Sequence, residues 1–244
     1  MAEKPYEWAD GATLEDHSRR KHKILREYFF EYLTVRCKLP QQEKFRLAII
    51  DGFAGGGRYQ CGTAGSPLIF VEELKRAIET VNILRAAQGM GLIEIECLLI
   101  LNDHNRDAIQ ALKANIAPLQ AEIAENVRQL HLRIEFLNET FEIAYPKMKL
   151  LLEQGRYRNV LFNLDQCGHS HVLRQTLLDI MRSVPAASGH ARPTAAHCLA
   201  ISSGSNRLSM WRTRPARAAA ARSIRSARMS PSASTSCRQR SACW

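Results

Sequence analysis

Residues 45–59 read FRLAIIDGFAGGGRY, and the interpretation of the whole chain starts from this stretch. An apolar run at 47–50 ends at Asp51, and four glycines follow within residues 52–57. Glycine adopts positive φ readily and lets the backbone approach a ligand closely. An acidic side chain at the end of a buried strand can hold a hydroxyl or ammonium group. The stretch therefore predicts a strand that runs into a ligand-binding turn.

The sequence on both sides of this stretch alternates between strand and helix patterns. Apolar segments predict strands at 47–51, 93–101, 130–137 and 160–164, and helical periodicity predicts helices at 13–35, 67–87, 108–116, 141–154 and 172–181. We interpret the strand interiors as mostly apolar rather than alternating, which is typical of a parallel sheet covered on both faces. We therefore predict an α/β, Rossmann-like fold whose ligand site lies at the carboxyl ends of the strands.

Local signals predict where two of the helices begin. Thr13 followed by Asp16 is typical of a capping box, and Ser66 before Pro67 predicts a helix with Ser66 as its N-cap. The first half of the helix at 13–35 also carries five basic side chains: His17, Arg19, Arg20, Lys21 and Lys23. We expect these to be exposed to solvent. Contact with a phosphate-bearing substrate is the alternative.

The positive charge of the chain is concentrated at one end. The net charge is +10, but residues 186–244 contain ten arginines and no lysine, aspartate or glutamate, so residues 1–185 are neutral overall. This tail is rich in Ala, Ser, Pro and Arg, and we predict that the reading frame was lost near residues 184–189, a genuine basic arm being the alternative. The charge is therefore weak support for a nucleic-acid partner. We divide the chain into an arm and amphipathic helix (1–44), a Rossmann-like domain (45–185) that we expect to be incomplete, and a low-complexity tail (186–244).

The remaining compositional features indicate an ordinary intracellular protein. Seven cysteines are scattered without a C-x-x-C motif, so neither a disulfide framework nor a metal site is predicted. Nothing resembles a signal peptide, and no apolar run reaches the roughly 18 residues that a membrane span needs. We expect a cytoplasmic protein with no membrane partner.

The glycine-rich turn resembles the first motif of class I S-adenosylmethionine-dependent methyltransferases. Asp51, Gly55 and Gly57 have its spacing, and with Phe53 the wording is similar to the D-x-F-A-G-x-G form of several nucleic-acid methyltransferases. The resemblance implies that Asp51 anchors the cationic amino group of S-adenosylmethionine and that the glycines pass against the cofactor. A dinucleotide fold would carry G-x-G-x-x-G leading straight into a helix. Residues 58–65 intervene here, and a purely structural turn also stays open.

Two later strand ends carry candidate cofactor ligands. In the same fold, Asp103 would accept hydrogen bonds from the two ribose hydroxyls of the cofactor, and a solvated loop aspartate is the alternative. Glu139, with Asn138 beside it, stands where a polar or acidic residue holds the adenine amino group. Asparagine and glutamate are common in loops, so this position is the least specific of the set.

The fourth strand end, FNLDQCGHSH at 162–171, lies where amino-group methyltransferases carry Asp/Asn-Pro-Pro-aromatic. Asp165 keeps the acceptor that would orient the target amine and is the predicted catalytic residue. Gln166 and Cys167 replace the proline and the aromatic ring, so the stacking platform is lost. A metal site that adds His169 and His171 is weakly supported without a spaced fourth ligand, and no base is placed beside Cys167 to make it a nucleophile.

The arrangement as a whole resembles the three-Cys-motif partner proteins over residues 5–183. The matching segments are 23–25 with Tyr28, 49–57, 65–68, Asp103, 161–172 and 176–181. The resemblance implies a methyltransferase-like domain and a separately encoded partner that bears a three-cysteine motif. Members would continue with a fifth strand, the rest of the sheet and a winged-helix-like region, which residues 186–244 do not resemble. A catalytically silent partner-binding module and a nucleotide- or NAD-binding oxidoreductase remain the alternatives.

Overall fold

The computed structural model describes residues 12–165, 172–182, 197–201 and 208–212. Helices and strands alternate along the chain from the first element to the ninth. Their order is α1 (Asp16–Arg36), β1 (Lys44–Asp51), α2 (Ser66–Ala87), β2 (Glu94–Asn102), α3 (Arg106–Asn126), β3 (Leu130–Leu137), α4 (Phe141–Gln154), β4 (Val160–Asn163), α5 (Arg174–Arg182), β5 (His197–Ile201) and β6 (Leu208–Arg212).

The strands form one sheet in the order β3-β2-β1-β4-β5-β6. The four strands β3, β2, β1 and β4 are all parallel, which confirms the predicted α/β, Rossmann-like fold. The chain crosses from the edge strand β3 back to β4 on the other side of β1, so the strand order reverses between β1 and β4. Asp51 and Asn163, the last residues of these two strands, are register partners at this reversal. In sheets of this kind, ligands bind beside that point, at the carboxyl ends of the strands.

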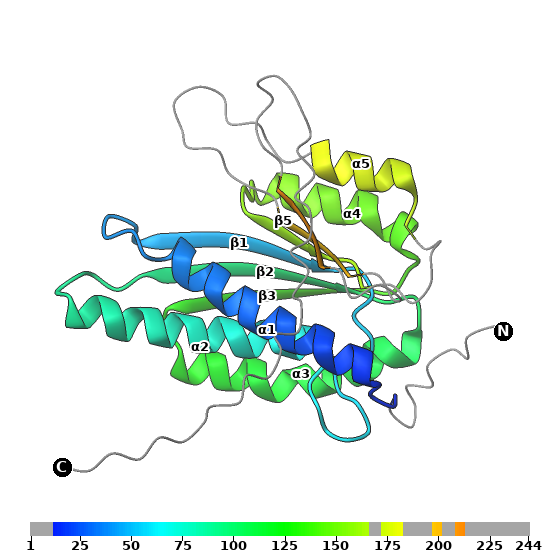
Figure 1. Cartoon of the computed structure of the whole chain (residues 1–244), viewed down its shortest axis with the longest axis horizontal. Helices are drawn as coiled ribbons and strands as arrows, with labels where there is room; N and C mark the ends of the chain where they lie inside the picture. The colour runs from blue at the N-terminus through cyan, green and yellow to red at the C-terminus, as the bar shows by residue number, and fades with distance from the viewer. Residues whose placement is uncertain (1–11, 166–171, 183–196, 202–207, 213–244) are drawn as a thin grey trace, which may run out of the picture.

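Helices cover both faces of the sheet, with α1, α2 and α3 on one side and α4 and α5 on the other (Figure 1). Successive side chains of a strand point to opposite faces. In β1, Leu47 and Ile49 therefore join the core under α1–α3, whereas Ala48 and Ile50 join the core under α4 and α5. Each fully buried leucine or isoleucine side chain contributes about 1.5–3 kcal/mol. The apolar run before the glycines is thus what fixes β1 in the centre of the sheet.

Two short strands come from residues 186–244, where the sequence predicts none. β5 lies parallel to β4, and β6 lies antiparallel to β5. Their sequences, HCLAI and LSMWR, are each only five residues long. Both segments fall within the part of the chain assigned to the low-complexity tail (186–244). Among the described residues, no helix has the length and apolarity required to span a membrane.

Both predicted helix caps were wrong, because the hydroxyl groups have other partners. The N-cap of α1 is Glu15, and Thr13 Oγ1 instead donates to Gln60 Oε1 at 3.3 Å. The N-cap of α2 is Gly65, since Ser66 Oγ donates to the carboxylate of Asp51. A hydrogen bond that a hydroxyl donates to an ionised carboxylate is stronger than one that it accepts from a neutral backbone amide. The same serine that was expected to start the helix therefore ties it to β1.

Arg85 holds together the segments that lead into β1 and β2. Its side chain is buried, and its guanidinium donates to five backbone carbonyls at 2.7–3.3 Å. The acceptors are the carbonyls of Cys37, Leu39, Pro40, Gln42 and Gly91. A buried charge is costly unless it is hydrogen-bonded in this way. The amino-terminal end of the sheet is thereby closed by a saturated polar side chain.

Candidate functional site

Asp51 lies at the end of β1, at the reversal of strand order. It is completely buried, and its Oδ2 accepts a hydrogen bond from Ser66 Oγ at 2.6 Å, so the amino-terminal end of α2 faces the carboxylate. Its Oδ1 accepts no hydrogen bond of good geometry from the described residues, although the Asn163 side chain and the Phe53 amide lie close enough to Asp51 to lower its pKa. Burial raises the pKa of Asp51 to about 7, although Ser66 and the nearby Asn163 lower it. A buried carboxylate with a free oxygen is a site for a ligand that donates hydrogen bonds or carries positive charge.

Two more unpartnered oxygens lie at neighbouring strand ends. Asn163 Oδ1, at the end of β4, and Glu139 Oε2, just after β3, are buried without a hydrogen-bond partner. Together with Asp51 Oδ1, they are the only buried side-chain oxygens in the described part of the chain that lack a donor. An unpaired buried polar group costs free energy, and native proteins pair nearly all of them. The carboxyl end of this sheet therefore offers acceptors at three strand ends and needs donors.

Asp103 braces the glycine-rich turn. Its Oδ2 accepts from the amide of Gly55 at 2.9 Å, and its Oδ1 accepts from the amide of Asn105 at 2.9 Å. Gly55 and Gly57 adopt φ values of 62° and 81°, the left-handed region that favours glycine. The sequence predicts that Asp103 binds ribose hydroxyls, and the structure places both of its oxygens on backbone amides. A carboxylate has about four lone-pair positions, so each oxygen can still accept a second hydrogen bond.

Close packing fixes the far side of the turn. A Cβ on Gly57 would lie 2.7 Å from Leu68 Cδ1 and 2.8 Å from Leu112 Cδ1. The carbonyl of Gly57 accepts from the amide of Gly65 at 2.7 Å, which brings the turn back to the start of α2. The predicted glycine Gly57 thus serves the contact between the turn and the helices α2 and α3.

Glu139 is held against the end of β2. Asn102 Nδ2 donates to the Glu139 carbonyl at 3.0 Å, and Glu139 Oε1 pairs with Lys147 Nζ. Asn138 Nδ2 donates to the Asp103 carbonyl at 2.8 Å. These contacts tie the ends of β2 and β3 together. They leave Oε2 of Glu139 as the free acceptor.

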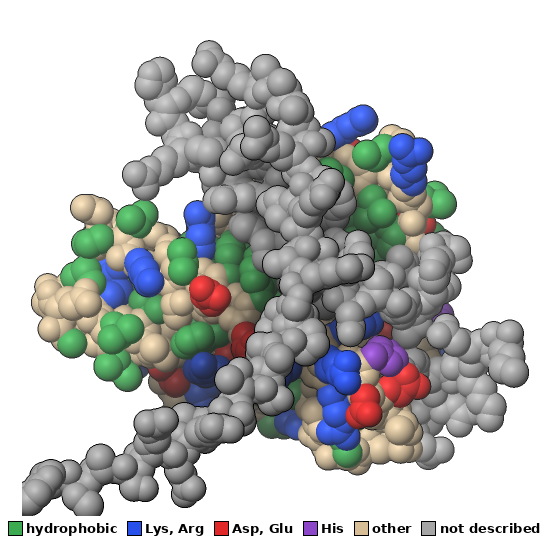
Figure 2. All heavy atoms as spheres, viewed as in Figure 1, with side chains coloured by type: hydrophobic (Ala, Val, Ile, Leu, Met, Phe, Trp, Pro, Cys, Tyr) green, Lys and Arg blue, Asp and Glu red, His purple; other side chains and the backbone are tan. Residues whose placement is uncertain are grey.

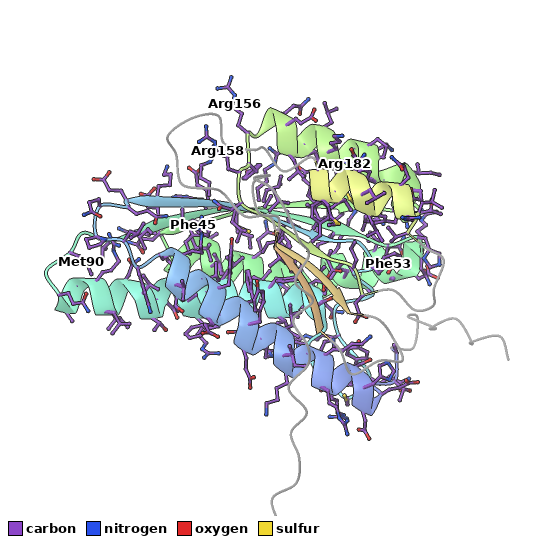
Figure 3. The ribbon with its side chains drawn as sticks, turned by 45° about the horizontal axis from the view of Figure 1, so that its top comes forward. Phe45, Phe53, Met90, Arg156, Arg158 and Arg182 are labelled. Carbon is purple, nitrogen blue, oxygen red and sulfur yellow. The ribbon has the colours of Figure 1, made fainter. Side chains whose placement is uncertain are left out.

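Phe53, a predicted cofactor contact, belongs largely to the apolar packing on the α4 side. Its ring stacks on Phe141, with centroids 5.7 Å apart and an interplanar angle of 24°. Figure 3 shows Phe53 at the end of the sheet near α5, with Phe45 and Met90 toward the opposite end. Phe53 is half-buried and therefore lies at the margin of the site rather than among its polar groups.

Asp165 forms an ion pair with Lys21 of α1. Lys21 Nζ lies 2.6 Å from Asp165 Oδ1, and the two side chains are only 12% and 28% exposed. Burial raises the pKa of Asp165, and the charge of Lys21 opposes this rise. The charge of Asp165 in turn contributes to the raised pKa of Asp51, so the two carboxylates lie close enough to interact.

The expectation that the whole basic face of α1 is exposed was wrong for Lys21. Basic side chains do line the N-terminal half of α1 in Figure 2, with acidic side chains and a histidine among them. Lys21, however, is turned inward to the segment that follows β4. Its neighbour His22 is also turned inward, with its ring 5.5 Å from that of Tyr59 and its Nδ1 buried without a partner. Burial, together with Arg26 and Lys21, lowers the pKa of His22 to about 4, so the imidazole is neutral at pH 7.

Sequence patterns missed three polar groups of this site. The sequence patterns predict Ser66 to be a helix cap and Lys21 to be exposed, and they give Asn163 no role of its own. Side chains alternate between the two faces of a strand, and this alternation could have identified Asn163. Asn163 stands two residues before Asp165 and two after Leu161, so it shares a face with the buried Leu161.

The other residues of the fourth motif, Gln166, Cys167, His169 and His171, lie outside the described residues. Within the described part of the chain, no three His, Cys, Asp or Glu side chains are grouped so that they could hold a metal ion. No protein-family model matches the chain, and no curated protein matches it significantly.

Proposed function

We propose that this protein is a methyltransferase-like protein of the three-Cys-motif partner type that binds S-adenosylmethionine where the strand order reverses. The observation that carries the proposal is the set of unpartnered buried oxygens on Asp51, Glu139 and Asn163. S-adenosylmethionine offers an ammonium group, two ribose hydroxyls and an adenine amino group, all of them donors. A donor-rich cation fits acceptors at several strand ends better than an anion does.

Each predicted ligand has a role that its surroundings support. Asp51 would hold the ammonium group, and the approach of that positive charge lowers the pKa of Asp51 and keeps it ionised. Gly55 and Gly57 shape the turn against which the cofactor lies, and Asp103 holds that turn while keeping lone pairs for the ribose. Glu139 would accept from the adenine amino group. Phe53 would border the site.

The bound cofactor would supply an activated methyl group. Methyl transfer depends mainly on holding the acceptor in line with that group. Asp165 would therefore act by orienting the acceptor and taking up its proton.

The start of α2 favours this proposal over a dinucleotide-binding oxidoreductase. In dinucleotide-binding folds, the amino-terminal end of the first helix meets a pyrophosphate. Here that end faces the Asp51 carboxylate through Ser66, at 2.6 Å. A pyrophosphate in the same place would lie beside a like charge, which is unfavourable.

Isothermal titration calorimetry on the full chain tests the proposal, with S-adenosylmethionine, S-adenosylhomocysteine and NAD as separate ligands. We expect saturable binding of the two adenosyl ligands and none of NAD. If neither adenosyl ligand binds, the proposal is contradicted and a catalytically silent partner-binding module is favoured. Binding of NAD alone would favour the oxidoreductase.

A further inference from the structure

We propose that Lys21 is a site of self-methylation, with its Nζ as the methyl acceptor. This inference rests on the proposed function, because it needs a bound methyl donor. The inference is based on one contact, the ion pair between Lys21 Nζ and Asp165 Oδ1 at 2.6 Å. In the proposed function, that carboxylate orients the group to be methylated. The chain itself thus provides a primary amine at the acceptor position.

The position of Lys21 differs from that of an ordinary surface lysine. Its side chain is 12% exposed, and its partner Asp165 comes two residues after Asn163, the register partner of Asp51. Lys23, two residues further along α1, is 77% exposed and lies 3.9 Å from Glu27 on the same helix. The two lysines share one helix, so Lys23 is a matched control for reactions that depend only on exposure.

The packing of α1 holds Lys21 in place. Arg26 bridges from α1 to α2 through Glu72 and Glu73, at 2.6 and 2.9 Å. Leu25 and Phe29 are buried in the core below the helix. A side chain whose helix is fixed on both sides loses little further freedom when it reacts, and such positioning favours an intramolecular transfer.

The transfer uses only groups already named. The Lys21 ammonium passes one proton to Asp165 Oδ1, which frees the lone pair on Nζ. That lone pair forms the bond to the methyl carbon, while the carbon–sulfur bond breaks and its electron pair stays on sulfur. The products are methylated Lys21, S-adenosylhomocysteine and one proton, which Asp165 releases to solvent.

Mass spectrometry of the full chain after incubation with S-adenosylmethionine tests the transfer. We expect the peptide that contains Lys21 to gain methyl mass, with a rate that does not change with protein concentration. Lys21→Met should abolish the gain, and Lys23→Met should leave it unchanged. A gain on Lys23 alone would indicate unassisted chemistry at exposed amines and would overturn the proposal.

A second measurement needs no turnover. Lysines of the full chain are labelled with acetic anhydride in the presence and absence of S-adenosylhomocysteine, after calorimetry has shown whether that ligand binds. We expect the bound ligand to lower labelling of Lys21 at least about fivefold and to leave Lys23 unchanged, because a ligand that lies against an amine blocks its access to the reagent. If the ligand binds but neither labelling nor methylation of Lys21 responds, the self-methylation proposal fails while the cofactor proposal stands. If the ligand does not bind, the cofactor proposal fails and this inference fails with it.

Discussion

The two ends of the sheet differ in how they satisfy buried polar groups, although Arg36 Nε, beside Phe45 and Asn159 toward the amino-terminal end, also lacks an acceptor. At the amino-terminal end, the guanidinium of Arg85 donates to five carbonyls and closes the segments before β1 and β2. At the carboxyl end, Asp51, Glu139 and Asn163 each keep a buried oxygen without a donor. A saturated polar group stabilises the fold, whereas an unsatisfied one costs stability and is retained where a ligand can satisfy it. We therefore assign a structural role to the polar groups at the amino-terminal end of the sheet and a ligand-binding role to those at the carboxyl end.

The largest expected effect is at the saturated end. Arg85→Met removes every one of these donors and leaves buried carbonyls unpaired, so we expect the free energy of unfolding to fall by roughly 5 kcal/mol. Urea denaturation followed by circular dichroism measures it. Arg20→Met, at an exposed position on α1, is the control and should change stability by less than about 0.5 kcal/mol. Equal, small losses of stability for both variants would show that Arg85 does not stabilise the amino-terminal end of the sheet.

At the binding end, the expected effect is a pH dependence of stability. The pKa of about 7 for folded Asp51 lies above the value of about 4 in an unfolded chain. The folded state therefore binds the proton more tightly, and this contribution is complete below about pH 4 and is lost as the pH rises through about 7. Relative to Asp51→Asn, which does not titrate, the wild-type free energy of unfolding should fall by up to about 4 kcal/mol across that interval. Urea titrations at several pH values measure the difference, and parallel curves for the two proteins would show that Asp51 is not buried as an acid.

A smaller effect tests the turn that joins the site to its helices. Gly57→Ala adds both backbone strain, at φ 81°, and a clash with Leu68, so we expect a loss of about 3 kcal/mol. Gly62→Ala isolates the strain, because φ is 76° there but no atom lies within 4 Å of the added Cβ, and about 1 kcal/mol is expected. Gly91→Ala has neither feature and should be near neutral. Thermal unfolding ranks the three variants, and a Gly57 loss no larger than that at Gly62 would show that the turn is not packed as described.

The sequence predicted the architecture well because long apolar segments leave few alternatives. The strands at 47–51 and 130–137 and the helix at 141–154 match the observed elements closely. For 47–51 the reason is that a strand buried on both faces must be apolar. The edge strand at 130–137 is only partly buried, and polar residues alternate with its apolar ones. Helix ends were less predictable. Serine is a common N-cap residue, but the Asp51 carboxylate, fifteen residues earlier in the chain, competes for the Ser66 hydroxyl.

The candidate site was predictable only in part. The carboxyl ends of parallel strands lie at the same edge of a sheet. The sequence alone therefore predicts that Asp51, Asp103 and Asp165, which follow three strand ends, lie near one another. It could not show which oxygens are already engaged. Asp103 accepts two backbone amides and Asp165 pairs with Lys21, and both facts depend on tertiary contacts between segments distant in the sequence.

The most direct test of the binding end is the affinity of S-adenosylhomocysteine for the wild-type chain and for Asp51→Asn, measured by calorimetry at pH 8. The substitution keeps the size of the side chain and an acceptor for Ser66, but it removes the charge that would hold the ammonium group. We predict that the wild type binds and that Asp51→Asn binds at least about tenfold more weakly, as expected for the loss of one charged hydrogen bond. Equal affinities, or no binding by the wild type, would contradict the assignment of this end of the sheet to the cofactor.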